Sequence, residues 1–316
     1  MILITGGSGF VGRAVIPRLL KAGYQVRLLS AGGKKSTEPW ANQIEVSEGS
    51  IYSVESLYRA MIGVHSVIHL ASAQWWGRKR DLEQIDLQGT RNVITAGRSA
   101  RIGRLLVMSH LGASQSSAFM LLRAKGQMEE LVRSSGLAYT IFRSGIIFGQ
   151  GDIFVNGIAQ LLRANPLVFL QPGRGEGLLH PIFIEDLAEV LVRSLEHLST
   201  VDETIGVGGP EYMTFNEIVR TVMRVSRAKR LIVPVPPYSL RALSAIVGRF
   251  FPNFPMTPQW FDLIAANRTA SMSTLYDLFE MQPRRFEDTI VTYMPKRRYG
   301  LELLRAMARR RPRGVA

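Results

Sequence analysis

Short runs of apolar and β-branched residues alternate with longer helical patterns along the first 150 residues. The predicted strands are Ile2–Thr5, Gln25–Ser30, Ile44–Val46, Ser66–Leu70, Arg104–Ser109 and Tyr139–Arg143. The predicted helices between them lie near 11–22, 53–61, 83–100 and 118–135. Strands that alternate with helices of this length form a parallel sheet with helices on both faces. Several of the strands are apolar throughout, which is typical of strands buried on both faces. We therefore predict an α/β fold with a Rossmann-type, doubly wound parallel sheet.

The pattern loosens after Gly149 and predicts a smaller C-terminal lobe. Its predicted elements are a helix at Phe154–Ala164, strands at His180–Ile184, Thr204–Val207 and Leu231–Val235, and helices near 185–197 and 214–227. Thr214 and Glu217 have the spacing of a capping box at the start of the last helix. We divide the chain into a dinucleotide-binding domain (1–150), a substrate or partner lobe partly interleaved with the sheet (151–295) and a basic tail (296–316).

Glycines follow the first strand and open the first helix. They are Gly6, Gly9 and Gly12, within the run 5–12. In a strand–turn–helix context this spacing predicts a pyrophosphate site: the first glycine allows a tight turn, the second lets the backbone approach the phosphates, and the third lets the helix pack on the strand. Free N–H groups at the helix start would hold the negative charge.

The end of the second strand bears on which dinucleotide binds. NAD sites usually place Asp or Glu there to hold the ribose 2′-hydroxyl, but residues 29–35 contain no acid. Arg13, Lys34 and Lys35 are candidates to pair with a 2′-phosphate. NADP(H) is therefore favoured as the cofactor, and NAD(H) remains possible.

Several further motifs together resemble one superfamily. They are Val67–Ala71, Gly89–Val93, Arg143–Gly149 and Pro181–Ala188. With the glycine loop, they resemble the extended and atypical short-chain dehydrogenase/reductases, from Met1 to about Val233. The runs 108–113, 122–129, 208–215 and 233–237 look like the branch that contains the NAD(P)H-binding accessory subunit of respiratory complex I and its bacterial relatives.

This resemblance implies roles for particular residues. The residues implied at the pyrophosphate are Gly6, Ser8, Gly9, Phe10, Val11 and Gly12, those at the adenosine ribose are Leu70, Ala71 and Ser72, and those beside the nicotinamide are Ser144, Gly145 and Ile146. Ser30, at the end of the second strand, is a further predicted cofactor-binding residue. Ser50 stands where the family often has an acid near the adenine, which puts that contact in doubt.

The catalytic pair of the superfamily is incomplete. Its enzymes use Tyr-x-x-x-Lys on one helix, in which the lysine binds the nicotinamide ribose and the tyrosine relays a proton. Lys125 fits the lysine, but Leu121 stands in place of the tyrosine, and Asp86 stands where an asparagine usually supports the site. Ser109 is a candidate active-site serine, and its alternative role is that of a turn former.

Histidines offer little in place of the missing tyrosine. His110 is a candidate acid at the end of a strand, whereas His180, which precedes a proline, is interpreted as structural. The five histidines are scattered without metal-ligand spacing, so we expect no metal site. The absence of cysteine excludes disulfides, thiolate metal sites and cysteine nucleophiles.

The positive charge is concentrated toward the C-terminus. Of the net charge of +14, residues 296–316 contribute eight basic residues and one acidic residue. Within 238–251, Leu240, Leu243, Val247 and Phe250 share one helical stripe flanked by arginines. That composition suits a helix in a membrane interface, although a helix packed on the lobe as core or lid is the simpler interpretation. We expect a membrane surface or membrane protein complex to bind at 238–251 and 296–316. No nucleic-acid module is recognisable.

Two functions of different class follow from these features. The first is an NADP(H)-binding accessory protein with weak or no catalysis, part of a membrane-associated respiratory or photosynthetic electron-transfer complex. The second is an atypical NAD(P)H-dependent reductase or epimerase that acts on a lipophilic substrate such as a quinone or isoprenoid. A sensor of the NADP redox state is a third possibility. No leader or membrane-spanning run is evident, so we expect a cytoplasmic location, either free or peripheral on the inner face of the membrane.

Overall fold

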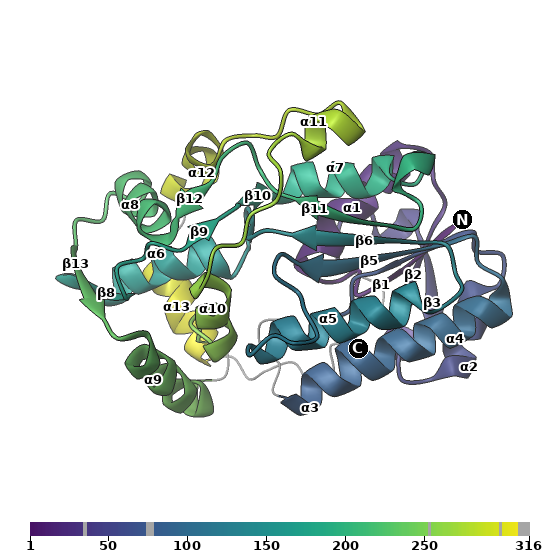
Figure 1. Cartoon of the computed structure of the whole chain (residues 1–316), viewed down its shortest axis with the longest axis horizontal. Coiled ribbons are helices and arrows are strands. Elements are labelled where there is room, and N and C mark those ends of the chain that lie inside the picture. The colour runs from purple at the N-terminus through teal and green to yellow at the C-terminus, as the bar shows by residue number, and fades with distance from the viewer. Residues whose placement is uncertain (34–36, 74–78, 252–253, 297–298, 309–316) are drawn as a thin grey trace.

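A parallel sheet and the helices on its two faces form one end of the molecule, and a mostly helical lobe forms the other (Figure 1). This computed structural model describes residues 1–33, 37–73, 79–251, 254–296 and 299–308. The seven strands of the sheet run in the order β11-β6-β5-β4-β1-β2-β3, and all neighbouring pairs are parallel. The predicted Rossmann-type sheet is therefore confirmed.

The observed strands differ from the predicted ones by a few residues at their ends. They are β1 (Ile2–Thr5), β2 (Val26–Ser30), β3 (Glu45–Glu48), β4 (Ser66–His69), β5 (Arg104–His110), β6 (Tyr139–Ser144) and β11 (Glu203–Val207). Successive side chains of a strand point to opposite faces, so in β1 Ile2 and Ile4 pack on one side of the sheet and Leu3 on the other.

Helices cover both faces of this sheet. One face carries α1 (Phe10–Lys21), α7 (Ile184–Arg193) and α11 (Thr274–Phe279), and the other carries α2 (Val54–Met61), α4 (Thr90–Ala100) and α5 (Met120–Arg133). Short 3₁₀ segments lie at η1 (Ala31–Gly33), η2 (Ala41–Gln43), η4 (Leu198–Thr200) and η5 (Met294–Lys296).

The helix predicted near 83–100 is not uniform. After α3 (Lys79–Asp81), the segment η3 (Leu82–Gly89) is π-helical, and α4 then continues as an α-helix. π-Helical turns are rare and occur frequently at functional sites. Here the wider turn carries Asp86, whose side chain is fully buried.

Within the described residues, the lobe combines six helices with three short strand pairs. The helices are α6 (Phe154–Ala164), α8 (Phe215–Val225), α9 (Pro237–Phe250), α10 (Pro258–Ile264), α12 (Phe286–Tyr293) and α13 (Tyr299–Ala308). The strand pairs are β7 (Ile147–Phe148) with β10 (Ile182–Phe183), β8 (Val168–Pro172) with β13 (Leu231–Val235), and β9 (Leu178–Leu179) with β12 (Met213–Thr214). The capping box of Thr214 and Glu217 is present at the start of α8.

Aromatic rings form the centre of the lobe. The Trp260 ring lies 4.8 Å from that of Phe154 and 5.2 Å from that of Phe215, measured between centroids. The apolar cluster around them continues into α5 through Leu121 and Leu122. The lobe therefore packs directly on the helix that carries Lys125, and the boundaries near 150 and 295 remain a prediction.

Two outer helices are relevant to partners. α13, at the start of the predicted basic tail, packs on α6, where the Tyr299 hydroxyl donates to Asn156 Oδ1 at 3.0 Å. In α9 only Leu240 and Ser244 are buried, so the interpretation of its apolar stripe as packed core is wrong for Leu243 and Phe250, and its role as a lid stays a prediction. No helix among the described residues is long and apolar enough to cross a bilayer.

Candidate functional site

The loop after β1 lies where the strand order reverses, because β1 has β2 on one side and β4 on the other. Open α/β sheets bind ligands at such switch points. Gly6 has φ +72°, and a Cβ there would lie 2.6 Å from the Ala71 nitrogen. A Cβ on Gly12 would lie 2.4 Å from Gly7 Cα. Gly6 thus serves the tight turn, and Gly12 is needed because the helix start lies against the loop at Gly7 rather than against the strand.

The second glycine leaves the start of α1 open. A Cβ on Gly9 would meet only the Gly6 carbonyl oxygen, at 3.1 Å, within 4 Å. Gly9 is the N-cap of α1, no side chain caps the helix, and its first turn contains no acid. Backbone N–H groups at such a terminus bind anions. The loop therefore has the open space and the donors that a pyrophosphate requires.

The residues predicted at the adenosine side lie at or just after the ends of β2, β3 and β4. The Leu70 amide donates to the Thr5 carbonyl at 3.0 Å, which holds the end of β4 against the loop. Ser30 ends β2 beside Glu48 of β3. The Ser50 hydroxyl accepts a hydrogen bond from the Tyr52 amide at 3.2 Å, so it stabilises the turn before α2.

Arg13 extends from the first turn of α1 toward an acid that our sequence argument missed. Its guanidinium lies 3.8 Å from the Glu38 carboxylate, and the two side chains are 47% and 35% exposed. Exposed pairs of this kind contribute about 0–1 kcal/mol, so Arg13 can exchange this partner for a phosphate at little cost. Lys34 and Lys35 lie outside the described residues.

The three residues predicted beside the nicotinamide are buried where β6 leads into the lobe. Ser144 and Ile146 are each 2% exposed. A Cβ on Gly145 would lie 1.8 Å from the His180 carbonyl oxygen, so glycine is required there. His180 Nε2 bonds to the Gly209 carbonyl at 2.7 Å, and its Nδ1 accepts from the Ala270 amide at 3.2 Å. His180 is structural, as predicted.

Lys125 is deeply buried, so it is not an ordinary surface lysine. Its Nζ lies 2.9 Å from Asp86 Oδ1, 3.1 Å from the Ser72 hydroxyl oxygen and 3.2 Å from the Met108 carbonyl oxygen. An ammonium has three N–H donors, so these three partners can satisfy all of them. Asp86 also accepts from the Ser72 hydroxyl at 2.7 Å and from the Ala73 amide at 2.9 Å.

Leu121, one turn before Lys125 on α5, is completely buried. It belongs to the apolar cluster that contains Trp260, Phe261 and Leu263 of α10. The side chain that replaces the family's tyrosine is therefore part of the contact between α5 and the lobe. Leucine offers no proton for transfer.

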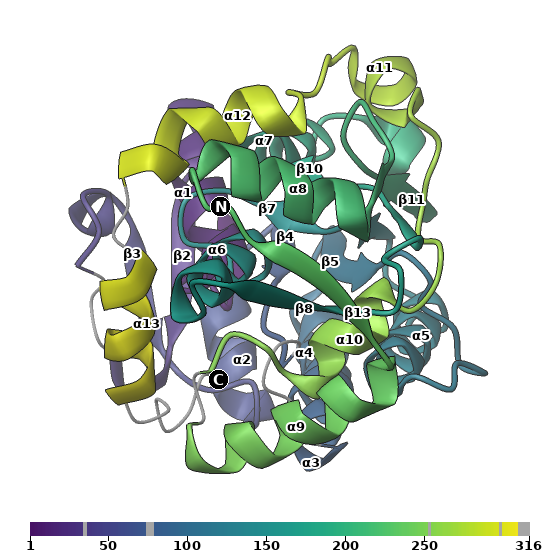
Figure 2. The same ribbon diagram turned by 90° about the vertical axis from the view of Figure 1, so that its left-hand side faces the viewer.

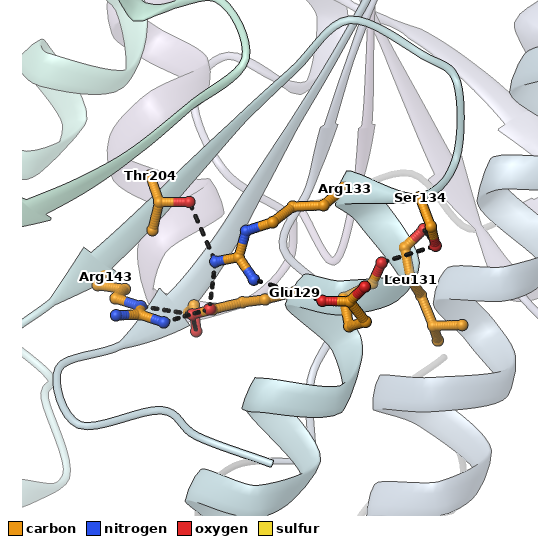
Figure 3. Close-up of polar contacts among 8 residues, drawn as sticks. Glu129, Leu131, Arg133, Ser134, Arg143 and Thr204 are labelled. Carbon is orange, nitrogen blue, oxygen red and sulfur yellow. Dashed lines mark hydrogen bonds and ion pairs between the residues drawn. The ribbon is translucent and has the colours of Figure 1, made fainter.

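Ser109 faces a buried carboxylate. Its hydroxyl donates to Glu129 Oε1 at 2.6 Å. Arg143 binds the same carboxylate through two nitrogens, at 2.8 and 2.6 Å, and Arg133 binds it at 2.8 Å (Figure 3). Burial acts to raise the pKa of Glu129, but the hydrogen bonds from Arg143 and Ser109 outweigh it and hold the pKa below its usual value. This cluster joins α5 to β5 and β6.

His110 is also buried and unsuited to act as an acid at neutral pH. Burial lowers its pKa to about 4, and the charges of Arg268 and Lys125 act in the same direction, against the Leu111 carbonyl that Nδ1 contacts at 2.9 Å. Arg268 comes from the lobe: its guanidinium donates to the Leu263 and Asp262 carbonyls at 2.9 and 2.7 Å. Among the residues that the structure describes, no three potential metal ligands gather.

Known proteins match this chain in its nucleotide-binding part and over most of its length. Residues 6–155 match the family described as NAD(P)H-binding. The mouse protein "NADH dehydrogenase [ubiquinone] 1 alpha subcomplex subunit 9, mitochondrial" is 26% identical over 81% of this chain and 68% of its own length. The photosystem II assembly factor Ycf39 of Guillardia theta is 26% identical over 89% of each chain.

The chain carries an NAD(P)H-binding domain. It is homologous to both of these relatives, which confirms the resemblance inferred from the sequence motifs. A solved structure of an NADPH-dependent quinone oxidoreductase from Escherichia coli, complexed with NADPH, has the same fold, with a TM-score of 0.73 and 20% identity over 93% of this chain and 99% of that one.

Three residues around the NAD(P)H-binding domain escaped the sequence argument: Glu38, Glu129 and Arg268. The sequence does contain a pattern that points to Glu129. Lys125 and Glu129 are one helical turn apart on the buried face of α5, which also carries Leu121 and Met128. Charged residues within an apolar stripe must find buried partners. Arg268 left no such signal, since its partners are backbone carbonyls.

Proposed function

We propose that this protein holds NADP(H) with weak or no turnover, as an accessory component of a membrane-associated electron-transfer complex of the respiratory or photosynthetic kind. The observation that carries this proposal is the environment of Lys125. Its three donors are satisfied by Asp86, Ser72 and Met108, and the position of the proton-relaying tyrosine is filled by the core residue Leu121. The open start of α1 supports nucleotide binding, whereas nothing at Leu121 supports proton transfer.

The preference for NADP(H) rests on Arg13. A 2′-phosphate carries more charge than Glu38 and can accept a bidentate bond from the guanidinium. We expect Arg13→Gln to weaken NADPH binding about 10- to 100-fold and to leave NADH binding nearly unchanged, since a charge-assisted hydrogen bond is worth roughly 1.5–3 kcal/mol. Fluorescence titration with both nucleotides measures this. Glu38→Gln is the matched variant and is expected to strengthen NADPH binding. Equal losses for both nucleotides in Arg13→Gln would contradict the assignment of NADP(H).

Restoring the tyrosine tests the proposed lack of turnover. Leu121→Tyr adds a ring and a hydroxyl to a packed cluster, at an expected cost of about 1–3 kcal/mol in the free energy of unfolding. We expect no gain of NADPH oxidation with quinone or isoprenoid acceptors, because Asp86 still binds Lys125. The double variant Leu121→Tyr/Asp86→Asn also removes the carboxylate that binds Lys125, so it tests whether this ion pair prevents turnover. Measurable turnover in the unmodified protein would instead favour the reductase or epimerase alternative.

The proposed partner is suggested by the relatives, one of which is a subunit of an NADH dehydrogenase and the other an assembly factor of photosystem II. We assign the docking regions to 238–251 and 296–316, and place the protein at the inner face of the membrane as a peripheral component. Co-purification from detergent extracts, with and without residues 309–316, tests the tail part of this assignment and keeps α13 in place. Loss of a co-purifying complex on truncation would support the tail as a docking region.

A further inference from the structure

α9 presents apolar side chains to solvent although it belongs to a folded lobe. Tyr238, Leu243, Ile246 and Phe250 are between 50% and 75% exposed. Leu243, Ile246 and Phe250 follow one another at intervals of three and four residues, so they project from one side of the helix. Contiguous apolar surface of this kind marks a site of interaction.

The strand pair beside α9 extends this surface. Leu231 of β13 pairs with Val168 of β8, and Val233 pairs with Leu170, so these four side chains share one face of the pair. Leu231 is 67% exposed and Leu170 is 39% exposed. α9 contacts β8, and both views show β13 and α9 at the same end of the molecule (Figures 1 and 2). We call the exposed side chains of α9, β8 and β13 the lobe-end face.

Cations without acidic counterparts border the lobe-end face. Residues 153–175 and 218–261 contain no Asp or Glu. Arg227, Lys229 and Arg249 are exposed and have no ion-pair partner within the described part of the chain. Arg227 and Lys229 also line an open cavity of about 640 Å³ at the end of α8, next to the start of β13. Apolar side chains surrounded by unpaired cations require a partner that is both apolar and anionic.

We propose that the lobe-end face docks on the surface of an anionic phospholipid bilayer, with α9 lying in the plane of the interface. Leu243, Ile246 and Phe250 insert among the acyl chains, and Arg227, Lys229 and Arg249 bind headgroup phosphates. A helix of 14 residues is about 21 Å long, which suits an interfacial but not a spanning position. A second copy of the chain is a poor occupant, because two such faces would place cations against cations.

This proposal deepens the membrane association in the proposed function and rests on it, but the nucleotide site is separate. Full-length protein is mixed with vesicles of phosphatidylcholine alone or of equal parts phosphatidylcholine and phosphatidylglycerol, and the bound fraction is measured by flotation. We expect binding to the anionic vesicles only, and its loss in high salt. Three cations near the surface correspond to roughly a 100-fold change in the partition coefficient.

Two triple variants test the two parts of the face. Leu243→Ser/Ile246→Ser/Phe250→Ser and Arg227→Gln/Lys229→Gln/Arg249→Gln are each expected to lower partitioning by at least about 30-fold. The matched controls are Tyr58→Ser/Ile62→Ser and Arg91→Gln/Arg98→Gln, which change exposed residues on the α2 and α4 side of the sheet. The controls should bind like the unmodified protein, and all variants should keep its melting temperature and NADPH affinity.

Several outcomes would overturn this proposal. They are equal binding to neutral vesicles, unchanged binding of both triple variants, and complete loss of binding on removal of residues 309–316 alone, which would assign the membrane contact to the tail. If the protein binds NADPH but no vesicle, the proposed lipid contact of the lobe-end face is wrong, and a protein partner is indicated there. A protein that binds vesicles but no nucleotide would overturn the proposed function instead.

Discussion

The phosphate loop and the start of α5 both face the carboxyl ends of the central strands, yet their backbone and side chains differ in character. At the loop, Gly9 leaves an uncapped helix terminus open to an anion. At α5, Leu121 is buried in the lobe cluster and Lys125 is surrounded by partners from its own chain. In the function proposed above, the first region holds the dinucleotide, whereas the second has lost the proton relay and become part of the core.

The largest effect is expected from breaking the buried pair at α5. Lys125→Met leaves the Asp86 carboxylate buried without a counter-charge, which should cost about 3–5 kcal/mol in the free energy of unfolding. Urea unfolding at neutral pH measures this loss. The double variant Asp86→Leu/Lys125→Met removes both charges and should be much closer to the unmodified protein.

Lys79→Met is the control for the buried pair, because Lys79 is 76% exposed and pairs with Glu83 at 3.7 Å. It should cost about 0–1 kcal/mol. If Lys125→Met cost as little as this control while weakening NADPH binding, Lys125 would be a free ribose clamp, and the contrast between the two regions would fail.

The next effect concerns the loop. Gly9→Asp places a favourable N-cap residue on α1, so the fold should persist, but its carboxylate would stand where phosphate is expected. We predict at least a 100-fold rise in the NADPH dissociation constant, about 2.7 kcal/mol, with little change in melting temperature. Gly248→Ala, at an open position in α9, is the matched control and should bind NADPH normally. Unchanged binding by Gly9→Asp would place the nucleotide elsewhere.

The last comparison concerns the pH dependence of stability, on which a single substitution is expected to have a modest effect per pH unit. His69 is the last residue of β4 and His110 is the last residue of β5. Burial lowers the pKa of each histidine to about 4. An unfolded histidine titrates near 6.5, so between these values the unfolded state binds more protons. Stability should therefore fall as pH drops from about 6.5 toward 4, by up to about 1.4 kcal/mol per pH unit for each histidine. Urea midpoints across this range measure the slope.

His110→Gln should reduce this slope relative to the unmodified protein. An unchanged slope in this variant would show that His110 is accessible to protons in the folded protein. It would then become a candidate acid at the reacting end again.

The sequence predicted what depends on local pattern. Strand and helix positions followed from apolar periodicity, and the glycine loop followed from its spacing between β1 and α1. The partners of Lys125 could not be derived in this way, because Asp86 is 39 positions earlier in the chain and its burial depends on the π-helical turn of η3. The exposure of α9 could not be predicted for a similar reason, because the sequence shows an apolar stripe whether or not the lobe covers it.

The central claim is that NADP(H) is bound and not consumed, and analysis of the nucleotide that accompanies the purified protein tests it most directly. The protein is denatured, the released nucleotide is identified, and the remainder is followed with NADPH and quinone acceptors for hours. We predict bound or readily bound NADPH and no oxidation. Failure of both NADPH and NADH to bind at millimolar concentration would contradict the assignment of the glycine loop as a nucleotide site. Steady oxidation of NADPH would contradict the proposal that Lys125 and Leu121 do not support turnover.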